Sequence, residues 1–208
     1  MRKLRLFILL TLIMGLLPLG VSTTEVGQVQ AARLNANCAT DLIISEYIEG
    51  SSFNKALEIY NGTGATVDLT GYRLSLYSNG STTAGSTYDF SGTLANDDVF
   101  VVAHSSADAA IQSVADDNSG VANFNGNDAV VLSKEGTDID VLGEVGNDAY
   151  WGGDVTLVRK ATVNAPSTTF DSNDWDEYAQ NTFSYLGSHT MTCAGELSLN
   201  KTAPAHVE

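Results

Sequence analysis

The chain has 208 residues, of which 25 are acidic and 10 are basic, so its formal net charge at pH 7 is −15. Proteins that bind nucleic acid neutralise the phosphates with Lys and Arg, so this composition argues against nucleic acid as a partner. Strong acidity is instead typical of soluble extracellular proteins and of proteins that hold divalent cations.

The first 32 residues have the layout of a secretory signal peptide. A basic start that includes Arg2 and Arg5 is followed by an apolar run over residues 6–17, and two Ala residues stand at 31–32. The apolar run is short for a membrane-spanning helix. We therefore expect residues 1–32 to be a signal peptide, with an N-terminal anchor helix as the alternative. Cleavage would leave 7 basic and 24 acidic residues in a protein that is secreted or on the cell surface and does not insert into the membrane.

Cys38 and Cys193 are the two cysteines of the chain, and they bracket the region in which strand signals occur. Behind a signal peptide, a pair of cysteines indicates a disulfide, because secreted proteins fold in an oxidising compartment. A bridge that closes so long a loop would stabilise the fold by about 5 kcal/mol. Two unpaired thiols are the alternative, and a metal site would need more ligands than two distant cysteines.

Seven short apolar runs separated by turn signals lie between the cysteines, and they predict a single all-β domain. The runs cover residues 41–48, 56–60, 72–78, 98–104, 128–134, 138–145 and 154–160. Turn pairs such as Asn79-Gly80 stand between them. Regularly spaced short strands of this kind indicate a β-sandwich or a barrel. One short helix is expected within residues 105–117, with Ser105 or Ser106 as its N-cap.

Glu46 is the residue that the strand pattern singles out. If the first strand alternates regularly, Ile44, Glu46 and Ile48 share one apolar face, while Glu49 lies on the opposite face at the strand end. A buried carboxylate is destabilising unless it is paired, so we expect a partner such as Lys55, backbone amides or a bound cation. A structural acceptor is the favoured interpretation, and a metal ligand or a catalytic carboxylate are the alternatives. The sequence places no histidine, nucleophile or second carboxylate beside Glu46 for catalysis.

Residues 44–80 carry motifs that resemble the N-terminal half of a bacterial lamin-tail domain. The motifs are Ser-Glu at 45–46, Glu-Ile-Tyr-Asn at 58–61 and Val-Asp-Leu-Thr-Gly-Tyr at 67–72. Residues 154–190 are similar to the end of the subgroup carried by secreted bacterial nucleases, so the resemblance extends over residues 41–190.

The resemblance implies an Ig-like β-sandwich over residues 38–193, with one short helix, and a non-catalytic role beside enzymes or surface repeats. It also implies that Glu46 and Glu58 are structural buried carboxylates of the sandwich. Residues 197–205 resemble the opening strand of Ig-like repeats on bacterial surface proteins. Residues 194–208 are therefore expected to be a linker or the start of a following repeat.

An acidic run at 171–177 surrounds Trp175 and is the candidate metal site. Oxygen ligands at alternating positions can bind calcium, although the glycine and the distal glutamate of an EF-hand loop are missing. The candidate ligands are Asp171, Asn173, Asp174 and Asp176. A solvated acidic turn is the favoured interpretation, with Trp175 and Trp151 as core residues. The three histidines are too few and too scattered for a zinc signature.

These observations together predict a secreted, non-enzymatic binding module that uses no cofactor and binds an unidentified protein or surface ligand. No residue is assigned a catalytic role, because the sequence carries neither a Gly-x-Ser-x-Gly elbow nor a nuclease motif. Two alternatives stay open. One is an accessory domain of a secreted nuclease, and the other is a calcium-dependent binder of carbohydrates or surfaces.

Overall fold

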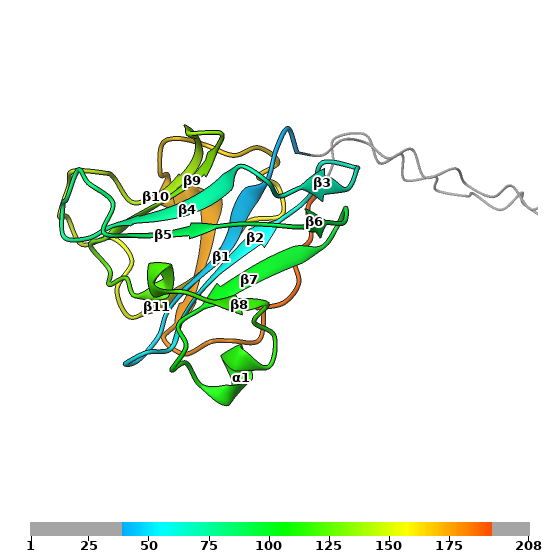
Figure 1. Ribbon diagram of the computed structural model, residues 1–208. Coiled ribbons are helices and arrows are strands. Elements are labelled where there is room, and N and C mark those ends of the chain that lie inside the picture. Colours follow the sequence, from blue (N-terminus) through cyan, green and yellow to red (C-terminus); the bar gives the residue numbers. More distant parts are fainter. Residues whose placement is uncertain (1–38, 193–208) are drawn as a thin grey trace, which may run out of the picture. The chain divides into compact units, whose positions relative to one another are not determined.

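The structure is a computed structural model, and it describes residues 39–192 (Figure 1). This part of the chain forms twelve strands, one short α-helix and two 3₁₀ helices. The strands are β1 (Ile43–Glu49), β2 (Lys55–Tyr60), β3 (Val67–Asp68), β4 (Tyr72–Tyr77), β5 (Ser86–Asp89), β6 (Thr93–Leu94), β7 (Val99–Ala103), β8 (Asp117–Asn118), β9 (Ala129–Lys134), β10 (Thr137–Leu142), β11 (Val155–Arg159) and β12 (Trp175–Ala179). The helices are α1 (Ala109–Gln112), η1 (Gly120–Ala122) and η2 (Ser172–Asp174).

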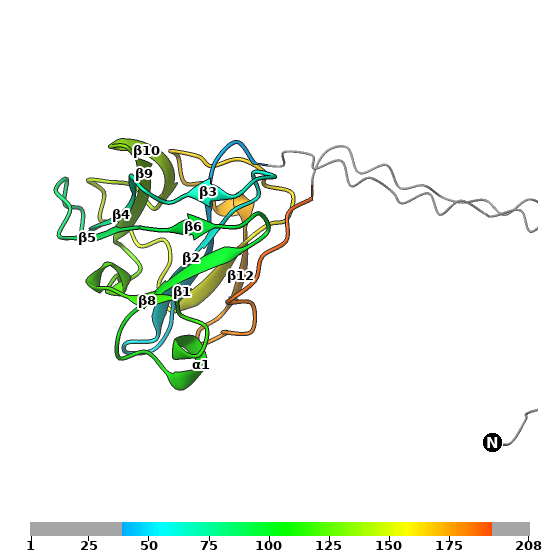
Figure 2. The same cartoon turned by 45° about the vertical axis from the view of Figure 1, so that its right-hand side comes forward.

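Two sheets packed face to face form an Ig-like β-sandwich (Figures 1 and 2). The strand order is β12-β11-β1-β2-β7-β8 in one sheet and β10-β9-β4-β5 in the other, with β3 and β6 as a separate ribbon. The main core lies between the sheets, where Ile44 and Leu57 share an apolar cluster with Leu74 and Leu132. The fold class predicted from the sequence is confirmed.

The outer face of the six-stranded sheet is covered as well. A second apolar cluster lies there, formed by Ile48 and Val101 with Ile111 of α1 and Leu186. Leu186 belongs to the C-terminal segment, which is the part of the described chain that follows β12 (residues 180–192). Every residue of β1 and β2 is consequently buried. Strands buried on both faces are usually apolar throughout, so the polar residues inside β1 and β2 need an explanation.

All seven apolar runs of the sequence form strands, whereas the five strands that the pattern missed have two to five residues each. The expected helix is present but spans only Ala109–Gln112. The prediction of Ser105 or Ser106 as its N-cap was wrong, because both precede the helix in a turn. The Asp108 carboxylate accepts from the backbone N–H of Ala110 instead, at 3.3 Å.

A β-bulge in β1 changes which of its residues face the core. The register between β1 and β2 shifts between Ile44 and Glu46, so Ser45 is the extra residue. Ile44 and Tyr47 therefore belong to the main core, while Ile48 belongs to the outer cluster and Glu46 shares its side of the sheet. The expectation that Ile44, Glu46 and Ile48 share one face was wrong, because the bulge interrupts the alternation.

A buried ion pair joins the two sheets beside this bulge. Arg159 of β11 donates from Nη1 to the Asp140 carboxylate of β10, and both side chains are almost fully buried. Asp140 also accepts from the backbone N–H of Ile44 at 2.8 Å and of Ser167 at 2.9 Å. The guanidinium lies over the Trp175 ring, 4.8 Å from its centroid. The carboxylate thus has a counter-charge and two backbone donors.

The Val67–Tyr72 motif of the lamin-tail pattern forms a tight turn after β3. Asp68 Oδ1 accepts from the backbone N–H of Thr70 at 2.9 Å. Gly71 has a φ of +88°, a conformation that glycine adopts without strain. The hydroxyl of the tyrosine that ends the motif donates to the Asp41 carboxylate. The motif therefore specifies the backbone conformation of the turn between β3 and β4.

Three predictions fall outside the described residues: the signal peptide at 1–32, the Cys38–Cys193 disulfide and the linker or repeat at 194–208. Within residues 39–192, no helix is long and apolar enough to cross a membrane.

Replacing Asp140 with Ala should lower the free energy of unfolding by about 3–5 kcal/mol, because it leaves the Arg159 guanidinium buried without its counter-charge. Urea unfolding followed by Trp fluorescence measures the change. Asp89→Ala is the matched control, since it breaks the solvent-exposed Arg73–Asp89 pair and should leave the midpoint nearly unchanged. Equal, small losses in the two variants would contradict the assigned role of Asp140.

Candidate functional site

Glu46 and Glu58 form a buried carboxylate pair on the outer side of the six-stranded sheet. They are directly opposite each other in the β1–β2 ladder, and their exposed fractions are 1% and 0%. Like charges at opposed positions repel each other, and burial disfavours both charges. The two side chains therefore need either donors or a proton.

Glu58 has donors. Its carboxylate accepts from the Ser45 hydroxyl at 2.7 Å and from the backbone N–H of Gly187 at 2.7 Å, and Ser188 adds a backbone hydrogen bond. Burial raises the pKa of Glu58, and these three hydrogen bonds act in the opposite direction. Two of the donors belong to the C-terminal segment that covers the sheet. Glu58 therefore ties this segment to β2, as expected of a structural acceptor.

Glu46 has no donor among the described residues, since neither of its carboxylate oxygens forms a hydrogen bond. Burial raises its pKa to about 9, and the neighbouring Glu58 adds to the rise. The expected partner Lys55 pairs with Glu49 instead. A pKa this high favours the protonated, uncharged form of Glu46 at neutral pH.

Glu49 differs from what the sequence indicated. It is 7% exposed, its side chain pairs with Lys55, and it also accepts from the backbone N–H of Asp154. Glu49 does lie at the end of β1, as expected, but it is buried there between Lys55 of β2 and the backbone of Asp154, which precedes β11. Loss of Glu49 would leave Lys55 buried and unpaired.

Two of the candidate ligands in the acidic run at 171–177 form hydrogen bonds with each other. Asp171 caps η2 by accepting from the backbone N–H of Asn173 at 2.9 Å, and it also accepts from the Asn173 side chain. Asp174 lies in η2, and Asp176 is exposed on β12 opposite Val158. Across residues 39–192, no three His, Cys, Asp or Glu side chains converge on one point where a metal ion could bind.

The two histidines among the described residues, His104 and His189, have different surroundings. Burial lowers the pKa of His189 to about 4, and the charge of Arg159 contributes, so this ring is neutral at pH 7. The ring of His104 stacks on the exposed Phe53 at 4.6 Å. His206 lies outside the described residues.

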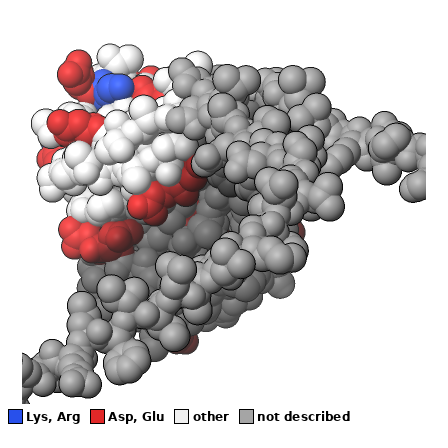
Figure 3. Space-filling view, turned by 90° about the vertical axis from the view of Figure 1, so that its right-hand side faces the viewer, with Lys and Arg blue, Asp and Glu red and all other residues white. Residues whose placement is uncertain are grey.

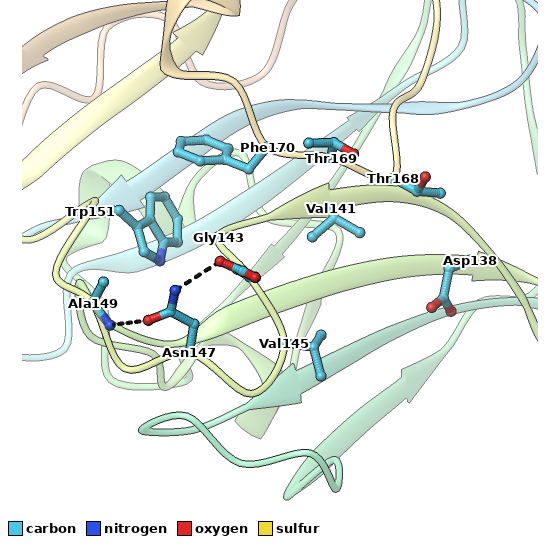
Figure 4. A pocket seen from close by; sticks show the side chains of 11 residues that line it. Asp138, Val141, Gly143, Val145, Asn147, Ala149, Trp151, Thr168, Thr169 and Phe170 are labelled. Atoms are coloured by element: carbon cyan, nitrogen blue, oxygen red, sulfur yellow. Dashed lines mark hydrogen bonds between the residues drawn. The ribbon is translucent and has the colours of Figure 1, made fainter.

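An open cleft of about 470 Å³ lies beside β10 (Figure 4). Trp151 and Phe170 line one end of it, with ring centroids 4.7 Å apart, and both rings are only partly buried. Val141 and Val145 add apolar surface, and Asp138 lies at the other end in the view of Figure 4. A cleft with adjacent aromatic rings and a few polar groups has the composition of a ligand site.

Hydrogen bonds fix the loop on one side of this cleft. Asn147 donates to Glu144 Oε2 at 2.8 Å. It also accepts from the backbone N–H of Ala149 at 2.9 Å, and Figure 4 marks this hydrogen bond. On the inner side, Trp151 Nε1 donates to the carbonyl of Asp128 at 3.1 Å. The indole N–H is therefore already engaged within the protein, and the ring carbons are the part of Trp151 that remains for contact with a ligand.

The cleft and the described surface are acidic. The cleft lining contains Asp138 and Glu144 and no Lys or Arg. Residues 39–192 contain 22 acidic and five basic residues, and four of the five basic side chains pair with carboxylates. The fifth, Lys160, donates to the carbonyl of Asn173 at 2.7 Å. Figure 3 shows one face, on which acidic side chains stand out from uncharged surface and basic ones are scarce.

The fold and these sites define an Ig-like sandwich module, and comparison with known proteins gives its family. The family model of the lamin tail domain matches residues 35–146, which is more than half of the chain. The chain belongs to the lamin tail domain family. The resemblance to a lamin-tail domain is therefore confirmed, while the similarity of residues 154–190 to the nuclease-associated subgroup stays a prediction. The sandwich continues beyond the match with β11 and β12.

Among solved structures, the chain is similar to the crystal structure of a DUF4876 family protein from Bacteroides thetaiotaomicron. The two are 12% identical with a TM-score of 0.43, and the alignment covers 79% of this chain and 74% of the other. No curated protein matches the sequence.

The sequence pattern predicted the strand that carries Glu46, but it did not indicate the cleft. The interpretation of Trp175 as a core residue is confirmed, since it is 5% exposed and belongs to the main cluster. Trp151 also packs against the core, but it is only partly buried and it lines the cleft. Its place in the Gly-rich loop before β11, outside any alternating strand, is the signal that could have indicated an accessible ring.

Replacing Glu46 with Gln should flatten the pH dependence of stability between about pH 4.5 and 9. In the unfolded chain Glu46 ionises near its ordinary pKa of 4.5, whereas in the fold it keeps its proton to about 9. The stability due to this shift is fully present below pH 4.5 and is lost as the pH rises through 9, at up to about 1.4 kcal/mol per pH unit.

Chemical unfolding of wild type and Glu46→Gln at pH 5, 7 and 9 measures this difference. The variant should match wild type at pH 5 and exceed it at pH 9. Glu177→Gln, which removes an exposed carboxylate from β12 of the same sheet, should follow the wild-type profile. If Glu46→Gln follows that profile too, Glu46 is not protonated in the fold.

Proposed function

We propose that this chain is a non-catalytic binding module of an extracellular or cell-surface protein, and that its ligand binds in the cleft between Trp151 and Asp138. The observation that carries the proposal is the pair of partly exposed aromatic rings in a preformed cleft. Exposed apolar surface of this kind is unfavourable in the free protein and is characteristic of binding sites.

The positions of the carboxylates support a non-catalytic role. A general acid or base must reach the proton that it transfers, directly or through one water. Glu46 and Glu58, the two glutamates of the family-like motifs, are at most 1% exposed, and the C-terminal segment covers Glu58. A substrate in solution has no access to them. Their burial instead suits a framework that carries a binding site elsewhere.

The extracellular location is supported by the signal-peptide pattern and by the surroundings of the cysteines. The backbone N–H of Ala39 donates to the carbonyl of Gly62 at 2.9 Å. The Met191 sulfur lies 3.1 Å from the point where a Cβ on Gly62 would stand. The described ends of the chain next to Cys38 and Cys193 therefore meet at one residue, which favours a disulfide between them.

Thiol titration tests the Cys38–Cys193 disulfide. The secreted protein, denatured without a reductant, should show no free thiol, and reduction should release two per chain. Two reactive thiols before reduction would refute the bridge.

Protein-observed NMR tests the cleft as a binding site. The chain has two Trp residues, so its two indole N–H signals separate the cleft residue Trp151 from the buried Trp175. A set of small probes that spans neutral sugars, amines, guanidinium compounds and carboxylates should contain members that shift the Trp151 signal and leave the Trp175 signal in place. Trp151→Ala should abolish their binding, because it removes the largest apolar surface of the cleft. Since this variant lacks the Trp151 indole, its binding is followed through the backbone amide signals of the cleft residues Val141 and Val145.

Tyr150→Ala is the matched control for this experiment. Tyr150 is 71% exposed and adjoins Trp151 but does not line the cleft, so its loss should leave binding unchanged. Probes that bind equally well to the Trp151→Ala protein would show that the cleft is not the site.

A further inference from the structure

We propose that the cleft binds an arginine side chain presented by a partner protein. This inference rests on the proposed function and adds the chemical class of the ligand. Three properties of the cleft support it: an acidic lining, an aromatic ring whose N–H is already hydrogen-bonded, and apolar side chains in the same lining.

The charge of the cleft favours a cation. Asp138 and Glu144 line it, and neither forms an ion pair with a described residue. Asn147 satisfies one oxygen of Glu144, and the other forms no hydrogen bond within residues 39–192. The excess of acidic residues in this part of the chain draws cations to the surface and repels phosphates and carboxylates. A neutral ligand would desolvate these carboxylates without replacing the lost water.

The aromatic end of the cleft suits the same ligand. The Trp151 N–H is engaged by the Asp128 carbonyl, so the ring can contact a ligand only through its carbon framework and π-electrons. A cation within about 6 Å of an indole centroid is attracted by the ring quadrupole, and tryptophan is the best partner. The chain already uses this arrangement internally, where the Arg159 guanidinium lies 4.8 Å from the Trp175 centroid.

Arginine fits better than lysine. A planar guanidinium can stack on the Trp151 ring while its N–H groups donate to the Glu144 carboxylate, whereas an ammonium group is a point charge and is more strongly hydrated. The apolar side chains of Val141 and Val145 lie in the same cleft and can cover the three methylene groups of the stem. A segment of a partner protein with an exposed arginine therefore meets all three properties.

Titration with Nα-acetyl-arginine amide tests the inference, with Nα-acetyl-citrulline amide as the uncharged isostere and the Trp151 indole signal as the readout. Arginine amide should shift the signal with a Kd on the order of millimolar, and citrulline amide should bind on the order of tenfold more weakly. Glu144→Gln should weaken arginine binding by about three- to tenfold and leave citrulline binding unchanged. Glu177→Gln is the control carboxylate outside the cleft.

The outcomes separate this inference from the proposed function. Nα-acetyl-lysine amide, titrated in the same way, should bind more weakly than arginine amide. Equal binding of the arginine and citrulline amides, equal binding of the arginine and lysine amides, or binding of a neutral sugar alone would overturn the arginine assignment and still place a ligand site at Trp151. No shift with arginine amide would also overturn it, and the broader probe set would then decide independently whether the cleft binds anything. Arginine binding that persists in Trp151→Ala, measured through the backbone amide signals, would place the cation elsewhere.

Discussion

The Asp140 carboxylate is the group on which the rest of the sandwich depends. It stands next to a register shift in β10 and faces the bulge of β1, so two irregular strand segments from different sheets meet at one side chain. The bulge releases the backbone N–H of Ile44 from the ladder, and Asp140 accepts it. Arg159 supplies the counter-charge and donates to the carbonyl of Ile44 at 3.2 Å. Because apolar side chains could not satisfy these backbone groups, the ion pair fixes the register of both sheets.

The bulge that creates this contact also explains the glutamate pair. One extra residue at Ser45 turns Glu46 toward the outer face, where Glu58 already uses the available donors. Two opposed carboxylates with a single set of donors can both be buried only if one of them is neutral. Glu46 therefore keeps its proton while Glu58 takes the hydrogen bonds. The stretch therefore combines one carboxyl group with a strongly raised pKa and one carboxylate that accepts three hydrogen bonds.

The sequence predicted the parts of the fold that depend on local pattern. The seven apolar runs became strands because each is long enough to bury its side chains, whereas two-residue strands such as β3 and β6 are defined by tertiary pairing and leave no periodic signal. Glu46 is buried on the side of Ile48 as expected, but the placement of Ile44 on that side failed, since a one-residue bulge reverses the alternation without changing composition. The lamin-tail motifs identified the family because they encode turns, such as the one that requires Gly71 to have a positive φ.

The candidate site was harder to predict than the fold, because its two walls are far apart in the sequence. Trp151 and the loop at 143–149 follow β10, while Phe170 belongs to a segment that comes after β11. No local pattern connects these segments. The contacts that bring them together are a backbone hydrogen bond between Val141 and Ser167 and a hydrogen bond from the Ser167 N–H to the Asp140 carboxylate, and neither follows from a local sequence pattern.

The hydrogen bonds of Ser167 connect this wall of the cleft to Asp140. The backbone N–H of Ser167 donates to the Asp140 carboxylate at 2.9 Å, and the N–H of Val141 donates to the carbonyl of Ser167 at 3.0 Å. The segment that carries Phe170 is thus fastened to β10 by the ion pair that joins the sheets, and this wall of the cleft is preorganised. The opposite wall, at 143–149, is held by exposed hydrogen bonds such as Asn147 to Glu144. Substitutions in that loop can therefore change which ligand fits while the ion pair, and with it the fold, is left intact.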